Sequence, residues 1–189
     1  MKKAIALLLA LVMVFALCAC GGGGDSASGD KVVKIGVFEP ASGDSGAGGK
    51  KEMLGMQYAN QETPTVEIGG ETYKVELVYS DNGSDSAKAV SAASKLVNEK
   101  VSLVLGSYGS GVSIAASDTF KQAGIPAIGV TCTNPNVTAG NSHYFRICFL
   151  DPFQGTVLAN YAYKELGVTT AYTLAMLGSD YDQGQIGRA

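Results

Sequence analysis

The sequence contains no tryptophan, a single histidine and few charged residues. Its net charge is −3 and its lysines and arginines form no cluster, so nucleic acid is not expected as a partner, because phosphate binding needs a basic patch. Cys, His and acidic residues do not recur at the spacing of metal ligands, and His143 stands alone in a polar stretch. Internal repeats are also absent, which excludes solenoid folds. These absences predict a globular protein without a metal centre.

Motifs for catalysis are missing as well. No serine lies in a G-x-S-x-G elbow, and neither a G-x-x-x-x-G-K-[ST] phosphate loop nor a G-x-G-x-x-G loop is present. A nucleophile needs a base held beside it, and neither His143 nor any lysine is placed to be that base. We therefore expect a protein that is not an enzyme and that uses no cofactor.

The N-terminal residues have the pattern of an export signal. Two lysines precede an apolar run over residues 4–17, which as a helix spans about 21 Å, short of the roughly 30 Å hydrocarbon core of a bilayer. This favours a signal peptide over a membrane anchor. The run ends in Leu17-Cys18-Ala19-Cys20, which resembles the bacterial lipobox and implies a signal peptide over 1–19 and lipidation of Cys20. An ordinary secretory signal with incidental cysteines is the alternative.

Residues 20–30 follow as the lipidated cysteine and a flexible linker rich in glycine, serine and alanine. About ten residues of this kind span roughly 17 Å, enough to hold a folded domain clear of a membrane.

Two cysteines remain in the body of the protein, Cys132 and Cys148. Export permits a disulfide between them, worth about 3 kcal/mol, but two separate buried thiols are the favoured interpretation, because the sequence cannot supply the bridging geometry.

Strand and helix patterns alternate from residue 31 onward. A Gly69-Gly70 pair between two strand patterns predicts a hairpin, and Asp151-Pro152 predicts a helix start with a capping carboxylate. The alternation predicts an α/β fold with a doubly wound parallel sheet. Strands are expected over 31–38, 65–68, 73–79, 101–105, 125–130, 144–149 and 170–177; helices are expected near 50–62, after the possible caps of 81–86, from the loop 106–111 to about 123, and over 151–167.

The last expected strand, 170–177, has no partner in this chain, and a lone strand cannot form a sheet. We therefore expect residues 31–150 to form an N-terminal α/β lobe, and residues 151–189 to form a crossover helix and the truncated start of a second lobe. Ligands of wound sheets bind beyond the carboxyl ends of the strands. Four small, polar loops are expected at that edge, namely 39–49, 106–111, 131–142 and 178–184.

Seven segments in order resemble the branched-chain amino-acid binding family among the bacterial substrate-binding proteins of ABC importers. They are 35–37 (IGV), 40–43 (PASG), 85–97 (DSAKAVSAASKLV), 106–113 (GSYGSGVS), 123–134 (AGIPAIGVTCTN), 145–146 with 151–155 (FR, DPFQG) and 179–184 (SDYDQG). The resemblance implies a two-lobe type I periplasmic-binding-protein fold, of which this chain only begins the second lobe. Members of this family close two α/β lobes on a ligand.

The same resemblance implies the ligand-binding residues. Its members grip a carboxylate with main-chain N–H groups and hydroxyls, and the matching positions here are Ser110, Thr131 and Thr133, with Tyr181 in the second lobe. The simpler roles are a helix cap for Ser110, loop hydrogen bonds for Thr131 and Thr133, and lobe packing for Tyr181. Ser42 and Tyr108 complete the candidates. The family often places an aromatic residue where this chain has Gly48, and Tyr108 is the candidate to compensate for it.

The function implied is that of an extracytoplasmic receptor, lipid-anchored to the bacterial membrane and monomeric. It is expected to bind a branched-chain or related amino acid and to deliver it to an ABC permease. Binding of amides, urea or other small polar solutes is one alternative, and a ligand-sensing ectodomain of a signalling receptor is another. An enzyme would need a nucleophile and base supplied outside this sequence.

Overall fold

A computed structural model describes residues 31–186, and the structural statements below concern those residues. The expected signal peptide (1–19) and the expected linker (20–30), with the candidate lipidation site Cys20, lie outside the described residues. Among residues 31–186, no helix combines the length and the apolar character needed to cross a membrane.

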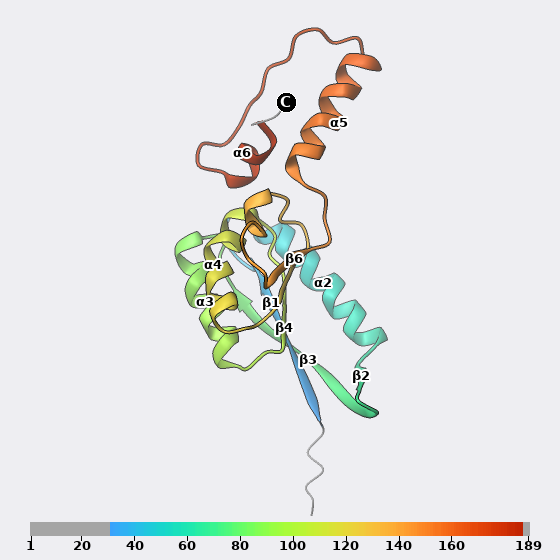
Figure 1. Cartoon of the computed structure of the whole chain (residues 1–189), viewed down its shortest axis with the longest axis vertical. Coiled ribbons are helices and arrows are strands. Elements are labelled where there is room, and N and C mark those ends of the chain that lie inside the picture. Colours follow the sequence, from blue (N-terminus) through green and yellow to red (C-terminus); the bar gives the residue numbers. More distant parts are fainter. Residues whose placement is uncertain (1–30, 187–189) are drawn as a thin grey trace, which may run out of the picture. The chain divides into compact units, whose positions relative to one another are not determined.

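A six-stranded sheet forms the centre of the lobe, in the order β2-β3-β1-β4-β5-β6 (Figure 1). All neighbouring strands run parallel except β2 and β3, which form the predicted hairpin around Gly69 and Gly70. Both glycines have positive φ angles, 60° and 83°, which suit the tight hairpin turn. The strands are β1 (Val32–Glu39), β2 (Thr65–Ile68), β3 (Glu71–Asp81), β4 (Leu103–Leu105), β5 (Ala127–Gly129) and β6 (Tyr144–Arg146).

Helices cover both faces of this sheet. Figure 1 shows α3 and α4 on one face and α2 on the other, while α5 and α6 lie beyond the carboxyl ends of the strands. The predicted doubly wound α/β fold is thereby confirmed. The helices are α2 (Gly46–Glu62), α3 (Ser86–Asn98), α4 (Ser110–Gln122), α5 (Asp151–Lys164) and α6 (Asp180–Ile186), with a short 3₁₀ helix at Pro135–Val137.

The core lies between the sheet and the α3–α4 layer. Phe38 of β1 and Phe120 of α4 meet edge to face there, with ring centroids 5.5 Å apart. Helix α3 presents a face of small residues with one leucine, which lets it approach the strands closely: Ala89, Ala92, Ala93 and Leu96 are all buried. The helical spacing of the sequence predicts a face through Val90, Ala93 and Val97 with Leu96 beside them, and this was wrong for Val90, which is 46% exposed.

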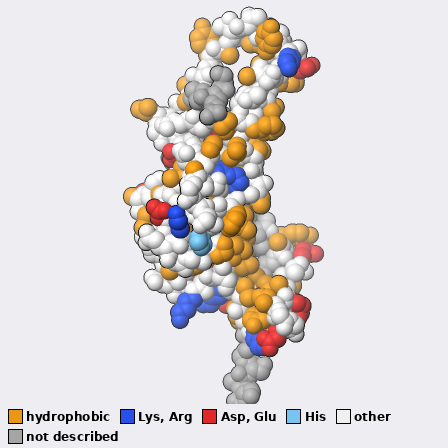
Figure 2. All heavy atoms as spheres, viewed as in Figure 1, with side chains coloured by type: hydrophobic (Ala, Val, Ile, Leu, Met, Phe, Trp, Pro, Cys, Tyr) orange, Lys and Arg blue, Asp and Glu red, His pale blue; other side chains and the backbone are white. Residues whose placement is uncertain are grey.

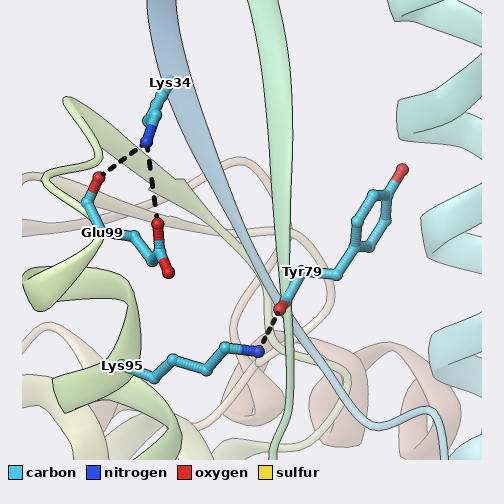
Figure 3. Close-up of polar contacts among 4 residues, drawn as sticks. All are labelled: Lys34, Tyr79, Lys95 and Glu99. Carbon is cyan, nitrogen blue, oxygen red and sulfur yellow. Dashed lines mark hydrogen bonds and ion pairs between the residues drawn. The ribbon is translucent and has the colours of Figure 1, made fainter.

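Two lysines connect α3 and the residue that follows it, Glu99, to strands β1 and β3 (Figure 3). Lys34 of β1 donates to the Glu99 carbonyl at 3.4 Å and pairs with its carboxylate at 3.7 Å, while Lys95 of α3 donates to the Tyr79 carbonyl at 3.1 Å. The Tyr79 side chain points the opposite way, toward α2. These contacts are exposed, so each is worth no more than about 1 kcal/mol, and the buried face of α3 matters more.

The expected strand over 170–177 was wrong, because those residues have no regular secondary structure. Tyr172, Leu174 and Leu177 are almost fully exposed. A strand is held by hydrogen bonds to neighbouring strands, and the described residues offer this segment no neighbour. The expected loop 178–184 also ends early, because α6 begins at Asp180 and places Tyr181 in a helix.

The expected cap of α5 was wrong as well. Leu150 is the N-cap residue, and Asp151 is the first helical residue, followed by Pro152. The Asp151 side chain is fully buried and caps nothing, although an acidic residue in the first helical turn still suits the helix dipole. It lies against α6, where a Cβ on Gly184 would be 2.2 Å from Asp151 Oδ2. Only glycine at 184 permits this contact between α5 and α6.

We predict that Leu96→Ala destabilises the full-length protein by about 2–5 kcal/mol, because it opens a cavity between α3 and the sheet. Val90→Ala, on the exposed side of the same helix, should change stability by about 0.5 kcal/mol or less. Urea unfolding followed by circular dichroism measures both variants. Equal shifts of the two midpoints would show that α3 packs through a different face.

Candidate functional site

A cavity of about 580 Å³ opens at the carboxyl ends of the parallel strands. Parallel pairing brings these strand ends to one edge of the sheet, so loops that are distant in sequence meet there. The loops after β1, β3, β4 and β5 contribute to the cavity, and α6 with the segment before it lies across them. The lining includes Ser45, Ser84, Ser86, Tyr108, Ser110, Thr131, Thr133, Gln154, Asp180 and Tyr181.

The N-terminal turn of α4 lies open at this cavity. Its N-cap residue is Gly109, which has no side chain to accept hydrogen bonds from the first helical N–H groups. Ser110, 2% exposed, does not cap the helix; its Oγ accepts a hydrogen bond from the Asn134 N–H at 3.1 Å. Ser110 thus ties α4 to the loop after β5. The uncapped N–H groups and the helix dipole favour an anionic group at this point.

Thr131 and Thr133 lie in the loop after β5 and line the cavity from one side. The Thr131 hydroxyl donates to Glu52 Oε1 of α2. Thr133 is 5% exposed, and its hydroxyl forms no hydrogen bond of normal geometry among residues 31–186, although it lies close enough to the Asp151 carboxyl to oppose the rise in pKa that burial gives that group. A buried hydroxyl without a well-formed bond is costly, so the Thr133 hydroxyl can gain from a ligand that reaches it.

Tyr108 occupies the space above Gly48. A Cβ on Gly48 would lie only 2.6 Å from the Tyr108 ring, so the ring rests directly on this glycine of α2. The Tyr108 N–H donates to Glu39 Oε2 at 2.7 Å, which fixes the loop that carries the ring. The ring is 41% exposed and faces the cavity. The loop after β4 therefore supplies an aromatic side chain at the place where α2 lacks one.

Tyr181 approaches from α6. Its hydroxyl accepts a hydrogen bond from Gln154 Nε2 of α5 at 3.3 Å, and both side chains line the cavity. Asp180 precedes it, close to the N-terminal turn of α4, where a Cβ on Gly111 would lie 2.9 Å from Asp180 Oδ2. Helix α6 thus brings both a phenol and a carboxylate to the rim.

Ser42 lies outside the cavity lining. Its hydroxyl donates to Asp81 Oδ2 at 2.7 Å, and the N–H groups of Ala41 and Gly83 donate to Asp81 Oδ1. Partial burial raises the pKa of Asp81, but the bonds from Ser42 and from these N–H groups outweigh it and lower this pKa. Ser42 therefore orders the loop after β1 and leaves the cavity to its neighbour Ser45.

Sequence reasoning missed three serines of the lining, Ser45, Ser84 and Ser86. The Ser45 N–H donates to Ser84 Oγ at 2.9 Å, which joins the loops after β1 and β3. Asp85 caps α3 by accepting from the N–H groups of Ala87 and Lys88, so the expected cap in this stretch is confirmed. The sequence did not reveal the order of the strands in the sheet. Because β3 lies beside β1 and parallel to it, the loop after β3 reaches the same edge of the sheet as the loop after β1.

The two cysteines are separate thiols in this structure. Burial raises the pKa of the Cys132 thiol to about 11, and it also raises the pKa of Cys148. Both thiols are therefore protonated near neutral pH.

Arg146 of β6 holds the backbone of the loop after β5 in place. Its guanidinium donates to the carbonyls of Cys132 and Asn134 at 3.1 and 3.0 Å.

With this geometry in place, comparison with known proteins identifies the family. A family model described as "Periplasmic binding protein" matches residues 32–189. The chain belongs to the periplasmic binding protein family. Its relatives include a Leu/Ile/Val-binding protein homolog of Brucella abortus, 33% identical over 130 residues, which are 68% of this chain and 35% of that protein. The chain spans about a third of the length of the curated relatives it matches.

Solved structures of periplasmic binding proteins are similar to this lobe. The leucine-binding protein LivK of Thermotoga maritima has a TM-score of 0.77 and 36% identity over 82% of this chain and 44% of its own. LivJ of Streptococcus pneumoniae, solved with isoleucine, has a TM-score of 0.66 and 34% identity over 72% and 39%. A Rhodopseudomonas palustris solute-binding protein solved with 4-hydroxybenzoate has 0.63 and 26% over 72% and 37%. These relatives are binding proteins and not enzymes, as predicted for this chain.

We predict that Gly48→Ala and Gly55→Ala differ in sign although both lie in α2. Gly55 has open space around it, so alanine there should stabilise the protein by about 0.5–1 kcal/mol. At position 48 the new methyl group must displace the Tyr108 ring, which should outweigh this gain and lower the stability of the protein. Thermal unfolding measures both variants. In a Tyr108→Ala background Gly48→Ala should regain the stabilisation; a persistent loss there would rule out the ring as the cause.

Proposed function

We propose that this chain supplies the first wall of the ligand cleft of an extracytoplasmic solute receptor, which delivers an amino acid to an ABC permease. One observation carries the proposal: the uncapped first turn of α4 opens into the cavity beside the unpartnered hydroxyl of Thr133. Helix N–H groups suit a carboxylate, and a free hydroxyl can donate or accept. An α-amino acid offers groups for both.

A branched-chain or related amino acid is the proposed ligand class. The similarity to LivK and to LivJ supports it, and so does the Tyr108 ring, which offers an apolar surface beside the polar groups of the cavity. Ser110, Thr131, Thr133 and Tyr181 are the proposed contacts. Ser110 acts mainly by holding the loop after β5 against α4.

A small polar solute is the second candidate. Ser45, Ser84 and Ser86 give one end of the cavity a hydroxyl-rich lining, which suits a polar group better than a branched aliphatic chain. The similarity to the protein solved with 4-hydroxybenzoate also shows that this fold accommodates ligands of another shape. Amides and urea, which belong to this second candidate, lack the anionic group that suits the N-terminus of α4, whereas 4-hydroxybenzoate has one.

A second lobe is proposed to complete the cleft. Helix α5 exposes apolar side chains on several sides, which Figure 2 shows as surface of the hydrophobic colour; they are Phe153, Val157, Leu158, Tyr161 and Tyr163. A helix of this kind is normally covered by further protein. We propose that residues 31–150 form the first lobe and that residues 151–189 lead into the second. The receptor is further proposed to be a monomer held at the membrane by lipid on Cys20.

Calorimetry on the full-length protein tests the ligand class. Leucine, isoleucine and valine should bind, and leucinamide should bind at least about tenfold more weakly than leucine, because it lacks the carboxylate that meets α4. Serine, asparagine and 4-hydroxybenzoate form the comparison panel. Tighter binding of that panel would favour the second candidate, and no binding of any of these compounds would overturn both.

We also predict that Thr133→Ala weakens ligand binding by about 1–3 kcal/mol, or roughly 5- to 150-fold, since it removes a buried hydroxyl that pairs with the ligand. Thr133→Ser keeps the hydroxyl and should retain most of the affinity. Thr65→Ala, in the exposed hairpin, is the matched control. Unchanged affinity in Thr133→Ala would remove this hydroxyl from the site.

A further inference from the structure

Two glutamates stand behind the wall of the cavity. Glu39, at the end of β1, is 1% exposed, and its Oε2 accepts a hydrogen bond from the Tyr108 N–H at 2.7 Å. Glu52, on α2, accepts a hydrogen bond from the Thr131 hydroxyl through its Oε1. Neither glutamate belongs to the cavity lining, yet each holds one residue that does.

The second oxygen of each carboxyl group is unsatisfied. Glu39 Oε1 and Glu52 Oε2 are buried and have no hydrogen-bond partner within the part of the chain that the structure describes. Two ionised carboxylates cannot satisfy each other, because each can only accept. A single proton between them would give both oxygens a partner and would remove the repulsion of two buried charges.

The surroundings favour that proton. Burial, and then hydrogen bonding and charge from Glu52, raise the pKa of Glu39 to about 10, although the Tyr108 N–H acts in the other direction. Tyr144 of β6 also faces Glu39, and Cys148 faces Glu52; neither is cationic. Over residues 31–186 no Lys or Arg side chain forms an ion pair with either glutamate. Nothing there replaces the proton as a neutralising charge.

We propose that Glu39 and Glu52 share one proton and thereby position Tyr108 and Thr131, so that the affinity of the cavity for its ligand depends on this proton. The inference rests on the proposed function and extends it to two positioning residues outside the cavity. When the proton is present, the pair joins β1 to α2 and both cavity residues stay fixed. When it leaves, two negative charges repel, and the wall carrying Tyr108 and Thr131 loosens.

A pH titration of leucine binding to the full-length protein tests this inference. In the wild type the dissociation constant should rise with pH once the pair loses its proton, by up to about tenfold per pH unit for one linked proton. In Glu39→Gln the amide can accept from the Tyr108 N–H and donate to Glu52, so it replaces the shared proton permanently. Glu52→Gln does the same from the other side.

Each single variant should therefore show a flatter pH profile than the wild type as the pH rises through about 10, the pKa of Glu39 in the folded protein. The leucine ammonium titrates equally in all proteins, so the difference between profiles isolates the pair. Glu99→Gln, on the exposed Lys34 pair, is the matched control and should follow the wild-type profile. Identical profiles for wild type and Glu39→Gln would overturn the shared proton.

The double variant Glu39→Gln/Glu52→Gln provides an independent check. In the double variant the single oxygen of each amide accepts a hydrogen bond, from the Tyr108 N–H on one side and from the Thr131 hydroxyl on the other. The two amide NH₂ groups must then face each other, and neither can accept a hydrogen bond. Leucine binding should then be weaker in the double variant than in either single one. A double variant as good as the singles would show that the two free carboxyl oxygens do not meet.

Thermal unfolding separates failure of this inference from failure of the proposed function, since it needs no ligand. The folded-state pKa of Glu39 lies above its ordinary value of 4.5, so the folded protein holds a proton that the unfolded chain releases. Wild-type stability should fall as pH rises from about 5 to about 10, and Glu39→Gln should lack this fall. If leucine does not bind but the melting profiles differ in this way, the shared proton stands and only the ligand class fails.

Discussion

Parallel pairing of β1 with strands on both of its sides is the constraint from which the site follows. Residues 32–39 pair with residues 74–81 of β3, and residues 35–37 pair with residues 103–105 of β4. In this register β1 ends at Glu39, opposite Asp81 and close to the end of β4. The loops after all three strands must leave from one edge, because parallel strands end on the same side. Hydroxyls and backbone N–H groups gather there without any long-range motif in the sequence.

Several of the buried polar groups that the fold leaves unsatisfied lie at or near that edge. The hydroxyl of Thr133 and one oxygen of each of Glu39 and Glu52 are buried without a partner among the described residues, and each such group costs stability. Other buried polar groups of the lobe are paired, since Ser80 donates to the Ala92 carbonyl at 2.9 Å and Tyr144 donates to the Gly106 carbonyl at 3.0 Å, whereas Asn60 Oδ1 of α2 and both Asp151 oxygens have no partner among the described residues. Of these groups the Thr133 hydroxyl lines the cavity, where a ligand can supply its missing hydrogen bond.

Local patterns predicted the architecture well, because each of them has a local physical cause. Gly69-Gly70 fixes its hairpin through positive φ angles, and the alternation of strands and helices fixes the wound sheet. The failures concern features that depend on distant neighbours. Residues 170–177 have a strand-like composition but no strand to pair with, and Val90 is as apolar as Ala93 although only Ala93 faces the sheet. Composition cannot report which side of a helix a sheet will cover.

In the candidate site too, features with a local cause were predictable and features that depend on distant neighbours were not. The position of Ser110 at the start of α4 was predictable because a Gly/Ser loop followed by a helix pattern marks that place, whereas its bond to Asn134 was not. Ser84 was missed because its role depends on β3 lying beside β1. Glu39 was expected in the polar loop 39–49, whereas it ends β1 in the fold, and α2 brings a second carboxyl group, that of Glu52, to it.

The aromatic ring at the cavity comes from Tyr108 in the loop after β4 and not from position 48 of α2, and this affects how the cavity recognises its ligand. An aromatic ring attached to α2 would be held by a helix, whereas Tyr108 lies in a loop whose N–H depends on the Glu39 carboxyl. The ring therefore rests on α2 but is positioned from β1, and Gly48 must stay small to leave room for it. The apolar surface offered to the ligand is thus coupled to a buried carboxyl group, so the ring position responds to the ionisation of Glu39 as well as to packing.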